Sequence, residues 1–167
     1  LDGNQLTSVK GLEKLTQLKE LHLNYNPALT KAQIAELDGV LPKCEIYSNP
    51  PLTKEESAKV IEAAIRKELE KPTGELTKAD LAKVTRLNLN DTKITDAGLK
   101  ELAKLKNLTF LDLGRTKITD AGLKEVAKLQ KLDLLHLNDT KITDACLGNI
   151  AKMQKLTRLH LSSPKIT

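Results

Sequence analysis

The apolar and polar residues in the second half of the chain repeat with a period of 24 residues. The segment LNLNDTKITDAGLKELAKLKNLTF at 87–110 recurs from residue 111 as LDLGRTKITDAGLKEVAKLQKLDL and from residue 135 as LHLNDTKITDACLGNIAKMQKLTR, and a further copy starts at Leu159. In each copy an L-x-L stretch alternates apolar and polar residues, which predicts a short strand with its leucines facing inward. A fixed period of this size indicates a solenoid whose units pack on their neighbours.

After the strand, each copy changes to helical spacing. In the first copy, Leu99, Leu102 and Leu105 lie three residues apart and share one face of a predicted helix over TDAGLKELAKL. Thr95 or Asp96 is expected to cap the start of this helix. Each 24-residue copy therefore predicts one strand followed by one short helix.

The longer pattern L-x-x-L-x-L-x-x-T, as at 108–116, resembles the leucine-rich repeat family, and in particular bacterial repeats of the T-x-I-T-D-A-G-L kind. This resemblance implies an α/β fold, a solenoid with parallel strands on one face and short helices on the other. The family usually has Asn or Cys at the ninth position, where this chain has Thr92, Thr116 and Thr140, and then Pro164. A Thr hydroxyl can bond to the turn backbone but offers fewer donors than an Asn amide, so we expect a flatter or less rigid turn.

The first fifty residues form a different array, with a period of 22 residues. LDGNQL at 1–6 aligns with LNYNPAL at 23–29, which places Asn4 and Asn26 at the Asn position of the family. Such side chains are expected to bond to the loop backbone and to stack from turn to turn. The following segment predicts a helix from about Lys31 that stops near Asp38–Gly39, then a strand through Cys44 and Ile46. We interpret it as the terminal cap of this array.

A polar, proline-interrupted stretch, SNPPLTKEE at 48–56, is the predicted domain boundary. The next segment places five apolar residues on one helical face and then ends at Pro72 and Gly74; the five are Val60, Ile61, Ala64, Ile65 and Leu69. It resembles the helical amino-terminal cap of internalin-like bacterial repeat proteins. The predicted domains are thus 1–51, the end of the 22-residue array; 52–84, a helical cap or linker; and 85–167, the 24-residue array.

A partner is expected on the strand face, because the outward positions of successive strands line one surface of a solenoid. These positions vary while the rest of the unit repeats: 87–110 and 111–134 agree at 16 of 24 positions, and most differences lie in the strand and its flanks. The predicted partner-binding residues are Arg86, Asn88, Phe110, Asp112, Leu134, His136, Arg158 and His160.

Phe110 and Leu134 are predicted to be neighbours at the centre of this face, within a polar rim of Arg86, Arg158 and Asp112. The competing interpretation is that a loop or an upstream segment covers the apolar pair, since scattered apolar surface residues are common.

The three histidines, His22, His136 and His160, occupy the same strand position. Asp112, His136 and His160 form a row that could in principle bind a transition metal. A flat open row coordinates metals poorly, so solvated polar side chains are the preferred interpretation, and no metal or cofactor is predicted. Below about pH 6.5 the two adjacent imidazoles should make the face more positive.

Basic charge is confined to the second part of the chain. Residues 52–167 carry 22 Lys and Arg against 16 Asp and Glu, whereas residues 1–51 carry five against six. A lysine recurs in each T-K-I-T segment, at 93, 117, 141 and 165, and could serve an anionic surface or a nucleic acid. However, an Asp follows each of the first three lysines by three residues, and almost no aromatic residue is available to stack on bases. Solvated repeat surface is therefore favoured and no nucleic acid partner is predicted.

The remaining features bound the function. The cysteines at 44 and 146 both look buried, and two inert core thiols are favoured over a disulfide. No apolar run approaches membrane-spanning length. Leu1 and Thr167 both fall inside repeats, so we expect further sequence or cut ends beyond them, and the strand at 159–161 could pair head-to-tail with a second copy.

No catalytic motif is present: the chain has no Gly-rich phosphate loop, no G-x-S-x-G and no H-E-x-x-H. We therefore predict a non-catalytic module that binds a protein or peptide. The alternative is a structural spacer or self-assembling repeat. The family resemblance implies a bacterial interaction domain, exported or attached to a surface, although the residues themselves do not decide the compartment.

Overall fold

The computed structural model describes residues 1–26 and 28–162, and the chain divides into two compact units, Leu1–Pro51 (unit 1) and Leu52–Thr167 (unit 2). Each unit has its own cluster of buried apolar residues. No described helix is both long enough and apolar enough to cross a bilayer.

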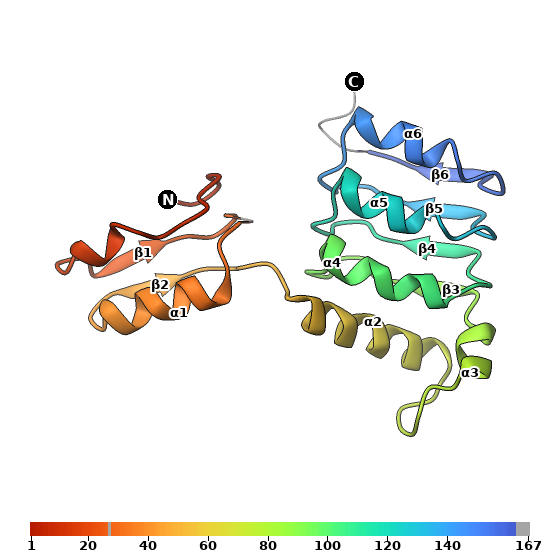
Figure 1. Cartoon of the computed structure of the whole chain (residues 1–167), viewed down its shortest axis with the longest axis horizontal. Helices are drawn as coiled ribbons and strands as arrows, with labels where there is room; N and C mark the ends of the chain where they lie inside the picture. The colour runs from red at the N-terminus through yellow and green to blue at the C-terminus, as the bar shows by residue number, and fades with distance from the viewer. Residues whose placement is uncertain (27, 163–167) are drawn as a thin grey trace. The chain divides into compact units, whose positions relative to one another are not determined.

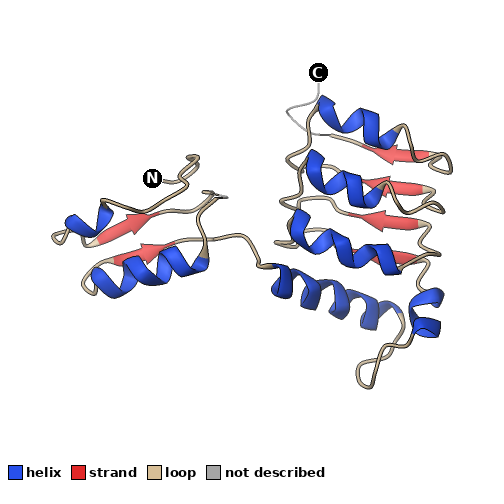
Figure 2. Cartoon of the chain, in the orientation of Figure 1, coloured by secondary structure: helices blue, strands red, loops and turns tan. Residues whose placement is uncertain are grey.

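Unit 1 contains a two-stranded parallel sheet and two helical segments. Its elements are η1 (Leu12–Lys14), β1 (Glu20–His22), α1 (Lys31–Val40) and β2 (Glu45–Tyr47) (Figures 1 and 2). The predicted period of 22 residues is confirmed where the chain starts, because the Asn24 carbonyl accepts a hydrogen bond from the Gly3 N–H (2.9 Å) and the Asn24 N–H donates to Asp2 (2.6 Å). The helix runs to Val40, one residue beyond the predicted stop.

Asn26 acts as expected for the Asn of a leucine-rich repeat. Its side-chain amide donates to the carbonyls of Leu1 (3.0 Å) and Leu23 (3.1 Å), and its Oδ1 accepts from the Leu6 N–H (3.1 Å). The Asn26 side chain is buried, so these bonds satisfy an amide that would otherwise cost free energy to bury. Successive coils are thereby tied together.

Unit 2 begins with two helices, and within the described residues it continues as three strand–helix repeats and a fourth strand. Its elements are α2 (Lys54–Glu68), α3 (Lys78–Lys83), β3 (Arg86–Asn88), α4 (Asp96–Leu99), η2 (Lys100–Lys104), β4 (Phe110–Asp112), α5 (Asp120–Val126), β5 (Leu134–His136), η3 (Asp144–Cys146), α6 (Leu147–Ile150) and β6 (Arg158–His160). The strands form one parallel sheet in the order β3-β4-β5-β6, with the helices in a second layer (Figure 1).

The register of this sheet confirms the predicted solenoid. Leu87 lies opposite Leu111, Leu111 opposite Leu135, and Leu135 opposite Leu159, so each strand repeats 24 residues after the last. Leu87, Leu111 and Leu135 have no exposed surface and share one core cluster. The fold is a leucine-rich repeat solenoid, as the alternation of apolar residues predicts.

The helical half of the repeat differs from the prediction. Leu99, Leu102 and Leu105 are all fully buried, as expected, but the α-helix of the first repeat ends at Leu99 and continues as the 3₁₀ segment η2. The expected caps also differ. Thr95 makes no side-chain cap bond, whereas the Asp96 carboxylate accepts hydrogen bonds from the N–H (2.8 Å) and hydroxyl (2.6 Å) of Thr119 in the next repeat.

The same bonds recur one repeat later, where Asp120 accepts from the N–H (2.9 Å) and hydroxyl (2.8 Å) of Thr143. The Thr and Asp of the T-D-A-G-L motif therefore join one repeat to the next as well as starting the helix. We refer to these paired bonds as the Asp–Thr ladder.

The threonines at the ninth position bond to the turn backbone, as predicted. The hydroxyls of Thr92, Thr116 and Thr140 donate to the carbonyls three residues earlier, at 2.7, 2.7 and 2.8 Å. Each turn also contains a residue with positive φ: Asp91, Arg115 or Asp139. Pro164, which follows in this series, and Lys165 lie outside the described residues.

Helix α2 packs on the first repeat. Ile61 and Ile65 are buried in the same core as the repeat leucines, and α2 contacts both β3 and α4. A Cβ added to Gly98 would lie 2.4 Å from the Cβ of Ser57, so the glycine permits this close approach. The second repeat uses Gly122 in the same way, because an added Cβ would lie 2.3 Å from Oδ1 of Asp96.

Candidate interaction face on strands β3–β6

The eight predicted partner-binding residues lie on the four strands of one sheet, two on each strand, at outward positions on either side of an inward leucine. We call this surface the strand face of unit 2. Strand pairing sets its neighbours: Arg86 lies opposite Phe110, Phe110 opposite Leu134, and Leu134 opposite Arg158. One line of side chains across the four strands therefore consists of a cation, an aromatic ring, an aliphatic side chain and a second cation.

Arg86 is oriented by Phe110. The guanidinium carbon lies 4.2 Å from the centroid of the phenyl ring, which is the geometry of a cation–π contact. The Arg86 side chain makes no ion pair among the described residues, so its N–H donors face solvent. Phe110 is half-buried and so presents part of its ring beside this cation.

The second line across the face consists of Asp112, His136 and His160. The His136 ring meets the edge of Phe110 at 5.4 Å between centroids and 83° between planes, and it stacks on His160 at 4.3 Å and 22°. Arg86, Phe110, His136 and His160 thus form an unbroken series of ring contacts over four strands.

Asp112 holds His136 from the other side. One carboxylate oxygen lies 3.4 Å from Nδ1 of His136, and the other accepts from the Gly114 N–H at 2.9 Å and from the Asn90 amide at 3.4 Å. Nε2 of His136 is buried and has no hydrogen-bond partner among the described residues. The imidazole is therefore fixed by packing and by one carboxylate.

This arrangement does not favour the metal interpretation. Two imidazoles that stack face to face direct their ring nitrogens outward in separate parallel planes, rather than toward one point. Within the residues that the structure describes, no group of three potential metal-ligating side chains comes together.

Asn88 and Arg158 lie on the two outer strands of the sheet, β3 and β6. The Arg158 guanidinium donates to Asp133 at 2.8 Å, and the hydroxyl of Thr157 donates to the same carboxylate. These hydrogen bonds, that of Thr157 first, lower the pKa of Asp133 below its usual value. Asn88 is exposed, and its Oδ1 accepts from the Asn90 N–H at 2.9 Å. The sequence did not single out Asp133, which lies just outside the strand.

The third histidine lies on the sheet of unit 1, where sequence reasoning proposed no site. His22 stacks on Tyr47 at 4.7 Å and contacts Glu20 at 2.7 Å through Nε2. The Tyr47 hydroxyl donates to Glu45 at 2.9 Å, and this bond to a carboxylate raises the pKa of Tyr47. The L-H-L triplet of β1, which recurs at His136 and His160, was the available signal for a ring contact on the sheet of unit 1.

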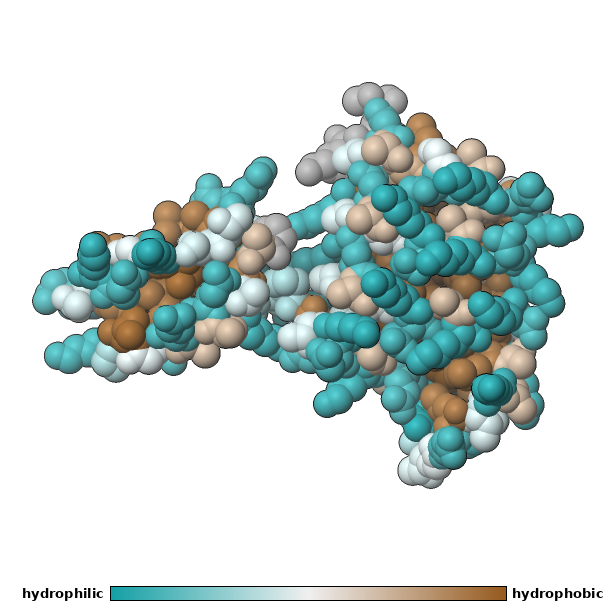
Figure 3. Space-filling view, viewed as in Figure 1, coloured by the Kyte–Doolittle hydropathy of each residue, from teal (hydrophilic) through white to brown (hydrophobic). Residues whose placement is uncertain are grey.

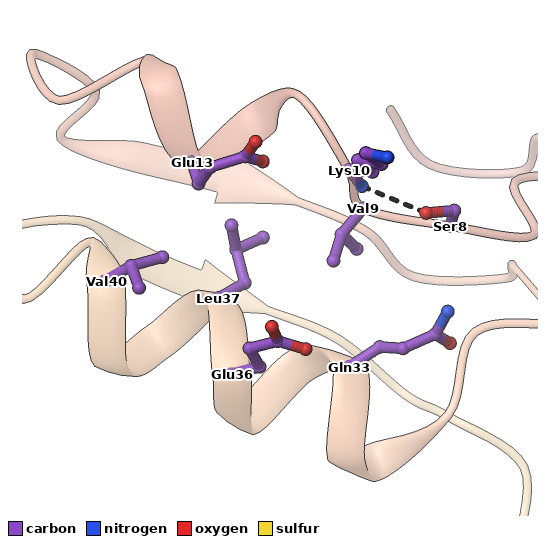
Figure 4. Close-up of a pocket in the computed structure, with 8 residues that line it drawn as sticks. All are labelled: Ser8, Val9, Lys10, Glu13, Gln33, Glu36, Leu37 and Val40. Atoms are coloured by element: carbon purple, nitrogen blue, oxygen red, sulfur yellow. Dashed lines mark hydrogen bonds between the residues drawn. The ribbon is translucent and has the colours of Figure 1, made fainter.

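Cavities lie on the helix sides of both units. In unit 1, a cavity of about 420 Å³ opens between η1 and α1 and is lined by Ser8, Val9, Lys10, Glu13, Gln33, Glu36, Leu37 and Val40 (Figure 4). Its charged side chains are Lys10 and Glu13, from η1 and the segment before it, and Glu36, from α1. In unit 2, a cavity of about 350 Å³ lies among α2, α3 and η2. Figure 3 shows mostly hydrophilic side chains over the visible face of unit 2.

Both cysteines are buried and free, Cys44 in unit 1 and Cys146 in unit 2. Cys146 replaces the glycine of the first two repeats and is fully buried. Burial, followed by the nearby Asp120 and Asp144, raises the pKa of its thiol. These observations agree with the expected inert core thiols.

The repeats of unit 2 also match a known sequence family. Residues 83–125 match the family model for leucine-rich repeats, in two copies. This fold typically mediates protein–protein interaction. Among curated protein sequences, none matches the chain.

Several solved bacterial structures are similar to this chain. Internalin C2 from Listeria monocytogenes is 26% identical over 65% of this chain and 56% of its own, with a TM-score of 0.47. Another internalin of that species is 21% identical over 98% of this chain and 47% of its own, with a TM-score of 0.38. A leucine-rich repeat protein of Leptospira interrogans is 18% identical over 97% and 53%, with a TM-score of 0.32. The chain thus spans about half the length of these proteins.

Proposed function

We propose that the chain is a non-catalytic interaction module, and that the strand face of unit 2 binds a protein or peptide. The observation that carries this proposal is the unbroken series of contacts from Arg86 through Phe110 and His136 to His160, beside the half-exposed Leu134. The partner-binding set is Arg86, Asn88, Phe110, Asp112, Leu134, His136, Arg158 and His160.

The physical reason is that these side chains are ordered before a partner arrives. A partner loses less free energy to side-chain ordering when rings and guanidinium groups already support one another. Residues that dominate binding energy are enriched in arginine and in large aromatic side chains, and near-neutral contacts around them exclude water. Phe110 and Leu134 would form the centre, and Asn88, Asp112 and Arg158 the rim.

An open strand face supports binding better than catalysis. Catalysis usually requires a pocket that excludes water around converging reactive groups. Here, Asp112 already engages His136, and the two imidazoles stack on each other. The proposed activity therefore requires neither a cofactor nor a metal.

We further propose that segment 52–84 is the amino-terminal cap of the 24-residue array. The support is that Ile61 and Ile65 of α2 join the repeat core and that Ser57 is buried against Gly98. Without such a helix, the apolar edge of the first repeat would be exposed to solvent.

The test is a pull-down with the immobilised chain, followed by affinity measurement on the captured protein. The variant Phe110→Ser/Leu134→Ser should retain the fold, because both side chains are outward, and should weaken binding about 100-fold or more if both are central residues. Leu147→Ser, which removes an exposed apolar side chain (48% exposed) from the helix side, is the matched control and should leave affinity unchanged. Equal affinity of all three proteins would reject the strand face as the binding site.

The alternative function is self-assembly, and one observation favours it. In β6, the last described strand, Leu159 is only partly buried, as is Leu161 next to it. Such an edge can accept a strand from a second copy. Sedimentation over a hundredfold range of concentration would show oligomers in this case, and a constant monomer mass would exclude it.

A further inference from the structure

Three lysines form a second surface feature of unit 2, on the loops that lead from each strand to its helix. We call Lys93, Lys117 and Lys141 the lysine row. The loops stack directly, because the Lys117 N–H donates to the Ile94 carbonyl (3.2 Å) and the Lys141 N–H donates to the Ile118 carbonyl (3.0 Å). Successive lysines are therefore one strand spacing apart, about 4.8 Å at the backbone.

These ammonium groups interact with one another unfavourably. Lys117 and Lys141 are half-buried, so their stems lie along the loops instead of extending freely into solvent. Burial lowers the pKa of Lys117, and the charges of Lys141 and Lys93 lower it further. Like charges at this separation destabilise the stack unless an anion lies between them.

Two of the three carboxylates that the sequence offered as counter-charges bond to threonines of the next repeat. Asp96 and Asp120, each three residues after a lysine, accept hydrogen bonds from Thr119 and Thr143 in the Asp–Thr ladder. Both carboxylates keep their negative charge, but their oxygens bond to threonine, and among the described residues neither forms an ion pair with a lysine of the row.

A second row of lysines on the helix side differs in this respect. Lys104, Lys128 and Lys152 also recur every 24 residues. Lys104 pairs with Glu101 at 2.5 Å and Lys128 with Glu125 at 2.8 Å. By contrast, Lys93 and Lys141 make no ion pair among the described residues. Two lysines of the helix-side row therefore have a carboxylate partner, whereas Lys93 and Lys141 of the lysine row have none among the described residues.

We propose that the lysine row binds a linear polyanion, a sulfated polysaccharide whose sulfate groups follow the row. A ladder of ammonium groups fits charged groups carried along a chain, because each one contributes a charge-assisted contact without needing a shaped pocket. Single-stranded nucleic acid would also need rings for its bases to stack on, and the lysine row itself offers none.

The experiment uses the full chain and a heparin dodecasaccharide, with affinity measured by calorimetry at several salt concentrations. The test variant is Lys93→Gln/Lys117→Gln/Lys141→Gln, and the control is Lys104→Gln/Lys128→Gln/Lys152→Gln, which removes the same charge from the same repeats. We expect the test variant to weaken binding at least tenfold at low salt and to reduce the slope of log Kd against log salt by about 2 to 3, roughly one for each ammonium group removed. The control should change affinity less than about threefold.

The outcomes separate clearly. Equal weakening of both variants, or no heparin binding by the parent chain, would overturn the proposal. A DNA duplex that binds as tightly as heparin and depends equally on the row would overturn the choice of a sulfated chain.

The test variant should fold, because it removes like-charge repulsion, and its thermal midpoint should match or exceed that of the parent. Phe110→Ser/Leu134→Ser should still bind heparin, so this result is independent of the strand face.

Discussion

Arg115 occupies a backbone conformation that suits few residue types. Its φ is 54°, close to the values of 57° and 56° at Asp91 and Asp139, the equivalent positions of the neighbouring repeats. Asp and Asn tolerate this left-handed region better than a long side chain does. The second turn is therefore more strained than the turns on either side of it.

Arg115→Asn should stabilise the chain by about 0.5–1 kcal/mol through relief of this strain. The change also removes the ion pair with Asp139 (3.7 Å), which is exposed and contributes little. Urea denaturation measures the result as a higher midpoint with an unchanged slope. Asp91→Asn is the control and should be near neutral, so a lower midpoint for Arg115→Asn alone would refute the strain argument.

Two glycines of unit 2 should respond in opposite directions to alanine. Gly122→Ala would place its Cβ 2.3 Å from Asp96 and 2.7 Å from Leu99, so the Asp–Thr ladder must shift, at a cost of about 1–3 kcal/mol. Gly148 in α6 has no atom within 4 Å of such a Cβ, and Gly148→Ala should stabilise its helix by up to about 1 kcal/mol. Equal effects of both substitutions in thermal denaturation would show that close packing is not why Gly122 is needed.

At this scale the sequence predicted inward and outward positions well and side-chain contacts poorly. The period of 24 residues brings Phe110 next to Leu134 without any knowledge of rotamers. The bonds between Asp96 and Thr119 were missed because an Asp at a helix start suggests a local cap, whereas its partner here lies 23 residues away. The recurring glycine of T-D-A-G-L, where alanine would favour a helix, was the available signal of close approach.

Among the elements of unit 2, the helices of the proposed cap have explicit start signals. Thr53 with Glu56 begins α2, and Thr77 with Asp80 begins α3, each as a reciprocal capping box. Asp80 also accepts a hydrogen bond from Lys71 at 2.8 Å. One carboxylate thus fixes both the start of α3 and the loop before it.

Asp80→Asn should make unit 2 less stable at pH 7 and have little effect in strong acid. The hydrogen bond from Lys71, and then those from Thr77, hold the pKa of Asp80 far below its ordinary value of about 3.9. A carboxylate with a lowered folded-state pKa stabilises the fold above the unfolded value, and this contribution is lost as the pH falls toward the folded value. The difference in thermal midpoint between parent and variant should therefore be constant from pH 7 to about 4 and shrink below it.

Lys71→Gln should reproduce most of this pH dependence, because Lys71 is the main cause of the shift. If the midpoint difference between the parent and Asp80→Asn were the same at pH 2.5 as at pH 7, the linkage would be wrong.

The elements themselves were largely predictable, and their boundaries were not. The strands of unit 2 follow from L-x-L, but the change from α4 to η2 within one helix depends on how tightly the repeat packs on its neighbour. In the third repeat Cys146 takes the glycine position, and its helix starts as the 3₁₀ segment η3. A side chain at this position therefore coincides with a different helix start.

Over the whole of unit 2, the residue positions that repeat every 24 residues are distinct from the positions that vary between repeats. Fully buried leucines and turn threonines recur in the first three repeats, and the Asp–Thr ladder joins these repeats into a scaffold. The outward strand positions differ and carry the proposed partner site, while the lysine row carries the proposed polyanion site. The sequence could indicate both surfaces. It could not indicate the ring contacts of the strand face or the Asp–Thr bonds beside the lysine row, because these contacts depend on three-dimensional packing.

The most direct test of the central claim is site-specific photo-crosslinking with the bound partner. A benzophenone amino acid replaces exposed Asn88 on the strand face or, as the matched control, exposed Lys100 on the helix side of the same repeat. If the strand face binds the partner, position 88 should form a covalent adduct that is absent from position 100 and disappears in the Phe110→Ser/Leu134→Ser background. An adduct from position 100 alone would contradict it.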